Sequence, residues 1–249
     1  MQFLFNKNQV YSTKYYVYTY NDNYFRIVKH KYIRNKGFEL VSNSNNDIDY
    51  NSENVKNASL SRTKRNIREI CLCNDFSYFA TLTINSHMCD RYSLNAVQDR
   101  LKKSLKKLKR KYNDFKYIFI TEKHKDGAFH FHGLIGGLPF SAFIINTNGF
   151  LELPIISNEM GFNSFSLIKD YNKCCNYITK YITKECIKNS HNQIYISSRG
   201  LKKATREEFS YIDFVPSFSN DYCDILDVYI NNSNKNDLMN LFFQLKEGK

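Results

Sequence analysis

Three residues between positions 122 and 132 are of the types that bind divalent metal ions. Glu122, His130 and His132 lie in the segment Glu-Lys-His-Lys-Asp-Gly-Ala-Phe-His-Phe-His. Side chains two residues apart in a β-strand share a face, so the two histidines present their imidazoles together while Phe131 points into the core. The Asp-Gly turn signal at 126–127 predicts a hairpin that brings Glu122 opposite them. A carboxylate and two imidazoles on one face form a metal site with open positions.

The competing interpretation is a pair of structural histidines, the more common role of an isolated His-x-His in a strand. The glutamate across a tight hairpin favours the metal site. His124 is two residues from Glu122 and can share its face, but the turn is expected to carry it away from the metal.

A second motif, Tyr-Ile-Thr-Lys, occurs twice in tandem at residues 177–184. The pattern of residues 172–187 predicts a helix, in which positions i, i+3, i+4 and i+7 share one face. Tyrosine has a pKa near 10, so neighbouring ammonium groups are expected to favour the phenolate that attacks phosphorus. The alternative is an amphipathic helix whose tyrosines only pack. The shared face consists of Tyr177, Lys180, Tyr181 and Lys184.

The two motifs together describe one reaction. A metal can polarise a phosphodiester and balance the charge on its oxygens, and a tyrosine on a helix can then attack in line. The products are a phosphotyrosine link and a free 3′-hydroxyl. Because the link keeps the energy of the broken bond, the reaction can be reversed to rejoin ends. Tyr181 has a lysine on each side, whereas Tyr177 has only Lys180 in reach, so we expect Tyr181 to make the first cut more readily.

The chain is basic, with a formal charge of +12 over 249 residues, which favours a polyanionic partner such as nucleic acid. Alternatively, the charge reflects only the composition of the chain, which is rich in Lys, Asn, Ile and Tyr, as AT-rich coding DNA would produce. A helix expected from Ser93 to about Tyr112 has one apolar face and a dense basic cluster. That cluster either contacts DNA or is the solvated side of a helix packed on a sheet, and the two are compatible. Its residues are Arg100, Lys102, Lys103, Lys106, Lys107, Lys109, Arg110 and Lys111.

The elements around these motifs predict an α+β fold with a central antiparallel sheet and flanking helices. Alternating aromatic or β-branched and polar residues over 10–41 indicate two or three strands, with a turn at 21–23. Residues 61–73 are predicted to form a further helix. Buried strands are predicted at 76–84, 117–121 and 129–135.

At these residues the chain resembles the HUH endonucleases, and among them the replication initiators of small single-stranded DNA phages and related bacterial elements. Residues 79–83, Phe-Ala-Thr-Leu-Thr, match the first motif of that family. The glutamate with His-x-His matches the second, and the two Tyr-x-x-Lys repeats match the third. Residues 197–201, Ser-Ser-Arg-Gly-Leu, also resemble phage-type members. The resemblance covers roughly residues 62–201, with motif order and spacing in agreement.

The resemblance implies an RRM-like nuclease core with the His-x-His on a middle strand and the tyrosine helix beside it. It also implies a Mg²⁺ or Mn²⁺ cofactor, a single-stranded DNA substrate and a 5′-phosphotyrosine intermediate. We therefore divide the chain into a strand-rich N-terminal extension (1–60) with a polar linker at 42–57, an HUH endonuclease domain (61–201) and a C-terminal tail (202–249) with a final helix at 235–245.

The expected function is site-specific nicking and joining of single-stranded DNA at a replication origin, which initiates and terminates rolling-circle replication. Lys180 and Lys184 would position phosphate or stabilise phenolate. Because the sequence has no G-x-x-x-x-G-K-[ST] motif, we expect a separate host helicase and polymerase. No segment reads as a signal peptide or a membrane span, so we expect a protein of the bacterial cytoplasm with no membrane partner.

Two alternatives remain. One is a relaxase or single-strand transposase that uses the same chemistry. The other is a non-catalytic nucleic-acid-binding module on an RRM-like sheet, which would need neither the metal ligands nor the tyrosine–lysine face.

Overall fold

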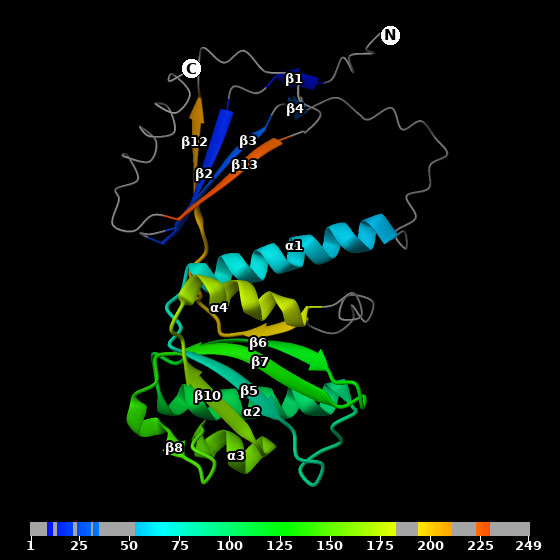
Figure 1. The fold of residues 1–249 in the computed structure, drawn as a ribbon, viewed down its shortest axis with the longest axis vertical. Helices are drawn as coiled ribbons and strands as arrows, with labels where there is room; N and C mark the ends of the chain where they lie inside the picture. The colour runs from blue at the N-terminus through cyan, green and yellow to red at the C-terminus, as the bar shows by residue number, and fades with distance from the viewer. Residues whose placement is uncertain are drawn as a thin grey trace. The chain divides into compact units, whose positions relative to one another are not determined.

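The computed structural model describes residues 9–11, 14–21, 24–30, 32–34, 53–182, 194–210 and 223–229. The chain divides into two compact units, one formed by residues 1–48 with 203–249 and the other by residues 49–202, and each has its own sheet (Figure 1). Among the described residues, no helix is both long and apolar enough to cross a membrane.

The larger unit is built on a seven-stranded antiparallel sheet in the order β11-β6-β7-β5-β10-β9-β8. The expected α+β fold with a central antiparallel sheet is confirmed, and so are its three predicted strands, which are β5, β6 and β7. The strands are β5 Tyr78–Thr83, β6 Lys116–Lys123, β7 Phe129–Gly136, β8 Ile144–Ile145, β9 Leu151–Glu152, β10 Asn163–Leu167 and β11 Tyr195–Ser197.

Helix α2 (Leu94–Lys111) covers one face of this sheet, and it matches the sequence prediction at both ends. The Ser93 hydroxyl accepts a hydrogen bond from the Ala96 N–H, which satisfies one of the unpaired donors of the first turn. The apolar face predicted for this helix packs against the side chains that β5, β6 and β7 point to that side, and all of it except the partly buried Leu94 is fully buried. The buried residues of this face are Val97, Leu101, Leu105 and Leu108.

The opposite face of the sheet carries α4 (Tyr171–Tyr177), the 3₁₀ turn η2 (Ile178–Tyr181) and, packed on them, α1 (Glu53–Leu72) (Figure 1). Tyr171 joins the two helices, because its hydroxyl donates to the Cys71 carbonyl at 2.7 Å and accepts the Phe76 N–H at 3.2 Å. The segment that bears the tyrosines is therefore anchored at its first residue.

Two predicted helices differ from the structure. Helix α1 begins at Glu53, eight residues before the predicted start, so it takes in the last residues of the predicted linker. Within the described residues, the predicted helix 172–187 is α-helical to Tyr177, continues as η2, and has extended backbone at Ile182, while residues 183–187 lie outside the described part of the chain. β-Branched residues at 178, 179 and 182 weaken the helix, and the Thr179 hydroxyl bonds the Asn176 carbonyl within it.

Between β7 and α4 the chain forms η1 (Phe140–Ala142), the short strands β8 and β9, and α3 (Pro154–Met160) before β10. The buried Asn163 side chain organises this segment: its oxygen accepts the Leu153 N–H at 2.8 Å, and its amide donates to the Ser157 hydroxyl at 2.8 Å. The segment extends the sheet beyond β5 without reaching the candidate site.

The smaller unit contains a four-stranded antiparallel sheet in the order β12-β2-β3-β13 and a separate pair, β1 with β4. Its β2–β3 hairpin pairs Asn21 with Tyr24, as the predicted turn at 21–23 requires. Segments from the two ends of the chain share this sheet, whereas the predicted helix at 235–245 lies outside the described residues. The strands are β1 Gln9–Tyr11, β2 Lys14–Asn21, β3 Tyr24–His30, β4 Tyr32–Arg34, β12 Thr205–Ser210 and β13 Cys223–Tyr229.

Candidate active site

The β6–β7 hairpin forms as the Asp-Gly signal predicts. Gly127 has a φ of +91°, a conformation that favours glycine, and its N–H donates to the His124 carbonyl at 2.9 Å. The resulting register pairs Glu122 with His130 and Ile120 with His132. The hairpin therefore brings the carboxylate to the two imidazoles, while Phe131 is fully buried on the other face.

Glu122 and His132 are in direct contact: Nε2 of the imidazole lies 2.7 Å from Oε2 of the carboxylate. The His132 side chain is 12% exposed and that of Glu122 is 34% exposed, so the pair faces a partly open surface. His124 is more exposed and lies beside Asp126, although its ring approaches that of His130 with centroids 5.1 Å apart.

Two threonines of β5 support the histidines from the neighbouring strand. Thr81 pairs with His132 and Thr83 pairs with His130 in the sheet register. Each threonine Oγ1 lies close to the Nδ1 of its histidine, at 3.3 Å and 3.2 Å respectively. These contacts occupy Nδ1 of each ring and leave Nε2 as the nitrogen that faces the site.

The donor types fit a divalent cation. A hydroxyl either donates or accepts, so each threonine can support the tautomer whose Nδ1 carries the proton and whose Nε2 ligates a metal. As the side chains stand, Glu122 bonds to His132 itself, and the described residues contain no group of three or more His, Cys, Asp or Glu already gathered around a metal position. Burial lowers the pKa of His130 and of His132, which favours the neutral imidazole that a metal needs.

The two tyrosines lie over this histidine face. The Tyr181 ring stacks on the His132 ring with centroids 3.7 Å apart and an angle of 9° between the planes. The Tyr181 hydroxyl donates to the Tyr177 hydroxyl at 3.0 Å. Phe79 of β5 lies among them, with its ring centroid 5.7 Å from that of Tyr177 and 6.2 Å from that of His132. The sheet and the tyrosine segment therefore meet in one aromatic cluster.

The electrostatic argument for Tyr181 remains a prediction, because one of its two lysines lies outside the described residues. Lys180 lies over the Tyr177 ring, with Nζ 5.0 Å from the centroid, and Lys184 is outside the described residues. Burial, followed by the hydrogen bond with Tyr177, raises the pKa of Tyr181 well above its ordinary value. What distinguishes Tyr181 is its contact with His132, whereas Tyr177 is 43% exposed.

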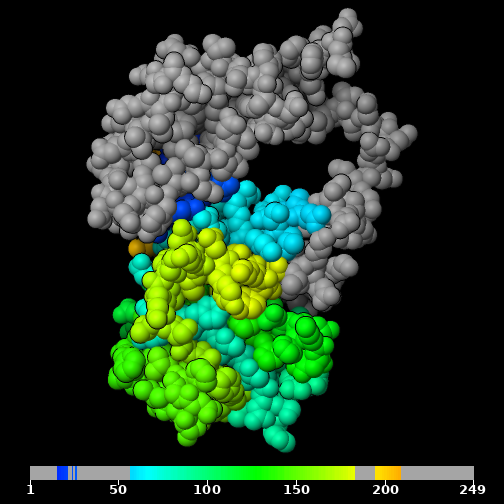
Figure 2. Space-filling model, viewed as in Figure 1, coloured from blue at the N-terminus to red at the C-terminus, as the bar shows by residue number. Residues whose placement is uncertain are grey.

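The tyrosine segment is held by α1 and by its own apolar side. The Arg68 side chain of α1 donates to the Asn176 side chain of α4. Ile178 and Ile182 are buried. Figure 2 shows α4, in yellow, on the outer surface of the larger unit. One side of α4 is therefore exposed on this unit.

The basic cluster of α2 lies on the face of the sheet opposite to the tyrosines. Glu159 of α3 pairs with three of its members: Arg100 at 3.6 Å, Lys103 at 3.6 Å, and Lys107. Lys109 donates to the Phe115 carbonyl at 3.0 Å. The remaining members, Lys102, Lys106, Arg110 and Lys111, are exposed.

The sequence prediction assigned no role to Phe79, Thr81 or Thr83. A signal for the threonines was present, because they are two residues apart, as the histidines are, and so share one face of a strand. Their contact with the histidines depends on strand register, which the sequence does not show.

Comparison with known proteins gives a family match. The model of the family Replication-associated protein ORF2 matches residues 77–186, the stretch that contains β5, the β6–β7 hairpin and both tyrosines. No curated protein and no solved structure matches the chain. Residues 77–186 therefore match the Replication-associated protein ORF2 family, a family of rolling-circle replication initiators of the HUH endonuclease type.

Proposed function

We propose that this protein nicks and joins single-stranded DNA at a replication origin through a 5′-phosphotyrosine intermediate. The contact of Tyr181 with His132, which in turn bonds Glu122, carries the proposal. Because the Tyr181 ring stacks on a candidate metal ligand, its hydroxyl is close to the place where a metal-bound phosphate would lie. A tyrosine with only a packing role would not have to contact His132.

In the first transfer, the Tyr181 oxygen forms a bond to phosphorus and the bond from phosphorus to the 3′-oxygen breaks. The phenol gives up its proton, and the departing 3′-oxygen takes one up. The 5′-phosphate remains on the protein, so attack by a 3′-hydroxyl reverses the step and rejoins the strand. Tyr177, within a hydrogen bond of Tyr181, serves the second transfer that ends a round.

Glu122, His130 and His132 are the proposed ligands of a Mg²⁺ or Mn²⁺ ion. When bound, such a cation supplies charge that polarises the phosphodiester and balances its oxygens. The threonines of β5 hold the two imidazoles in orientation. The proposed role of Lys180 and Lys184 is to bind the phosphate or stabilise the phenolate.

The proposed substrate is single-stranded DNA. A separate host helicase and polymerase open the duplex and synthesise the new strand. The exposed lysines of α2 supply sequence-independent contacts to phosphates. They lie across the sheet from the tyrosines, so they act on affinity and not on the chemical step.

The decisive experiment is a search for the covalent product. The protein is incubated with a library of single-stranded DNA and Mn²⁺, denatured, and the attached strands are sequenced. We expect strands that share one 5′-terminal sequence, linked to a peptide that contains residue 181 or 177. If the wild-type protein forms no such adduct with any strand, the proposed function is wrong.

A further inference from the structure

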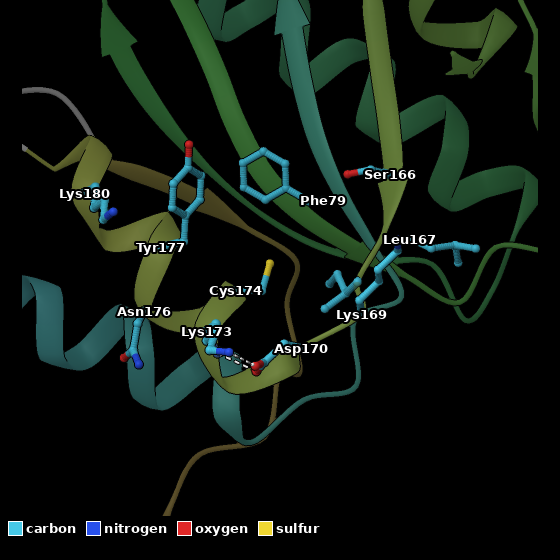
Figure 3. Close-up of a pocket in the computed structure, with 11 residues that line it drawn as sticks. Phe79, Ser166, Leu167, Lys169, Asp170, Lys173, Cys174, Asn176, Tyr177 and Lys180 are labelled. Carbon is cyan, nitrogen blue, oxygen red and sulfur yellow. Dashed lines mark hydrogen bonds and ion pairs between the residues drawn. The ribbon is translucent and has the colours of Figure 1, made fainter. Parts of the chain in front are cut away.

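A pocket of about 610 Å³ opens beside Tyr177, between β5, β10 and the start of α4 (Figure 3). It is distinct from the Glu–His face, because none of the three proposed metal ligands lines it. Tyr177 and Phe79 belong to both. The pocket therefore lies directly beside the candidate active site on the protein surface.

The pocket is basic. Three lysines line it, Lys169, Lys173 and Lys180, against one carboxylate, that of Asp170. That carboxylate is already engaged, since it accepts the Lys173 N–H at the start of α4 and pairs with the Lys173 ammonium at 2.9 Å. The lining thus keeps a net positive charge from Lys169 and Lys180, at opposite ends of the α4 segment.

The pocket also has apolar and aromatic walls. Phe79 is half-buried, while Leu167 is 59% exposed and Tyr177 is 43% exposed, although all three are large apolar side chains. Figure 3 shows the Tyr177 and Phe79 rings next to one another on one side, with Lys180 beyond Tyr177. Exposed aromatic rings among lysines are the usual combination for bases and phosphates of single strands, because every base has a face that stacks.

We propose that this pocket binds one nucleotide of the single strand, next to the phosphate that is attacked. The base lies against Phe79 and Tyr177, and the two phosphates that flank the nucleotide lie toward Lys169 at one end of the pocket and Lys180 at the other. The inference rests on the proposed function, since it takes single-stranded DNA as the substrate. The new element is a binding position for one nucleotide, which Tyr177 contacts and Tyr181 does not. A volume of about 610 Å³ is within the range of small-ligand sites and leaves room for a base with its sugar.

Crosslinking tests the position directly. The probe is an oligothymidylate of about 20 nucleotides, longer than the sites of about 4–16 nucleotides that single OB-fold domains cover. It carries one 5-iodo-2′-deoxyuridine and is mixed with the variant Tyr177→Phe/Tyr181→Phe, which cannot form the phosphotyrosine link. After irradiation, we expect mass spectrometry to find the crosslink at Phe79 or at position 177. Crosslinks confined to α2 or to the smaller unit would overturn the proposal.

Two further variants separate the pocket from overall charge. Ser166 is exposed on β10 and lines the pocket, so Ser166→Ile narrows it without a change of charge and without adding a ring on which a base could stack. Lys169→Gln removes one phosphate contact, which should lower the salt slope of binding by about 0.7. We expect both to reduce the crosslink yield at least several-fold. Arg65→Gln, an exposed residue of α1 outside the pocket lining, removes the same charge and should leave the yield within error.

Failure of the pocket and failure of the proposed function give different results. If wild-type protein forms the covalent adduct but the crosslinks avoid the pocket, the nucleotide site is wrong and the nicking proposal stands. If the crosslinks map to the pocket but no adduct forms with any strand, the pocket binds DNA and the nicking proposal is wrong. A Ser166→Ile variant that folds, by its unfolding midpoint, and crosslinks as wild type does would also exclude the pocket.

Discussion

The two faces of the seven-stranded sheet are made by the same strands and do different work. On β7, Phe131 and Ile135 point to α2 and are fully buried in the main apolar core. His130 and His132, the alternate residues, point to α4 and η2 and remain partly exposed. One face is closed by a long amphipathic helix, and the other is closed by a short segment that ends in two tyrosines.

Strand β7, with eight residues, thus contributes to the apolar core with one face and to the candidate active site with the other. The apolar face fixes the register and the plane of the sheet, because a shift of one residue would exchange the two faces. The polar face can then carry residues that contribute little to stability. Changes on the two faces should therefore separate chemistry from folding.

The largest effect is expected from the tyrosines. Phe keeps the ring and its stacking on His132 but removes the nucleophilic oxygen. The double variant Tyr177→Phe/Tyr181→Phe should form no covalent DNA adduct, Tyr181→Phe should form at least tenfold less than wild type, and Tyr177→Phe should lose less. The adduct is measured on denaturing gels and located by mass spectrometry. An adduct formed by the double variant would end the tyrosine mechanism.

Loss of a proposed ligand should nearly abolish cleavage and leave the fold intact. His132→Ala, His130→Ala and Glu122→Ala each remove one donor from the partly exposed face, without opening the α2 core. We expect cleavage to fall by about 100-fold or more, and EDTA to do the same to wild type. Circular dichroism serves as the folding control. Wild-type cleavage in EDTA would show that the metal assignment is wrong.

A smaller loss is expected from the threonine that supports His132. Thr81→Val keeps the β-branched shape and removes the hydroxyl that contacts Nδ1. Partners of this kind typically contribute 10- to 100-fold to metal affinity or activity, so we expect a decrease of about 10-fold, partly restored by more Mn²⁺. Thr81→Ser, which retains the hydroxyl, is the matched control. Equal activity of Val and Ser variants would leave Thr81 with a packing role only.

On the other face, the expected effect is on stability. Leu105 of α2 is completely buried, and Leu105→Ala should reduce the free energy of unfolding by about 2–5 kcal/mol. Urea denaturation measures it. Below the unfolding transition, adduct formation per folded molecule should match wild type. If the variant is fully folded and still forms less adduct than wild type, a change in the α2 core also affects the chemistry on the other face of the sheet.

The smallest effect concerns Glu159, whose pKa is lowered chiefly by the hydrogen bond from Lys107 and also by Lys103. A lowered folded-state pKa means that the carboxylate stabilises the fold above its unfolded pKa of about 4.3, and that this stabilisation is lost as the pH falls through the folded-state value. Glu159→Gln should cost about 1 kcal/mol or less at pH 7. The difference from wild type should vanish in acid, and a difference that persists there would exclude the ion pairs as its cause.

Much of the site could be predicted because its signals are local. The hairpin follows from one Asp-Gly turn, and the shared face of His130 and His132 follows from strand geometry. Helix α2 is marked at its start by Ser93 and along its length by regular apolar spacing. In each case the residues that decide the structure lie within a few positions of one another.

What escaped prediction depends on contacts between distant segments. Strand β10 (Asn-Ser-Phe-Ser-Leu) has little apolar character and forms because β5 offers it an edge. The stacking of Tyr181 on His132 joins residues 49 positions apart and depends on the end of α4, where an ideal helix was expected. The sharing of one sheet by β2 and β12 is equally long-range.

The 3.0 Å between the two tyrosine hydroxyls limits how many DNA ends the site can hold. Two phosphodiester anions joined to oxygens this close would repel strongly and would compete for the same cations. In this arrangement the two hydroxyls therefore cannot both carry a DNA end. The 3′-hydroxyl that releases the first end from Tyr181 is made by the second cut, so Tyr177 must be loaded while Tyr181 is still linked. The two tyrosine side chains must therefore separate between the two transfers, and the hydrogen bond that joins them has to break in every round.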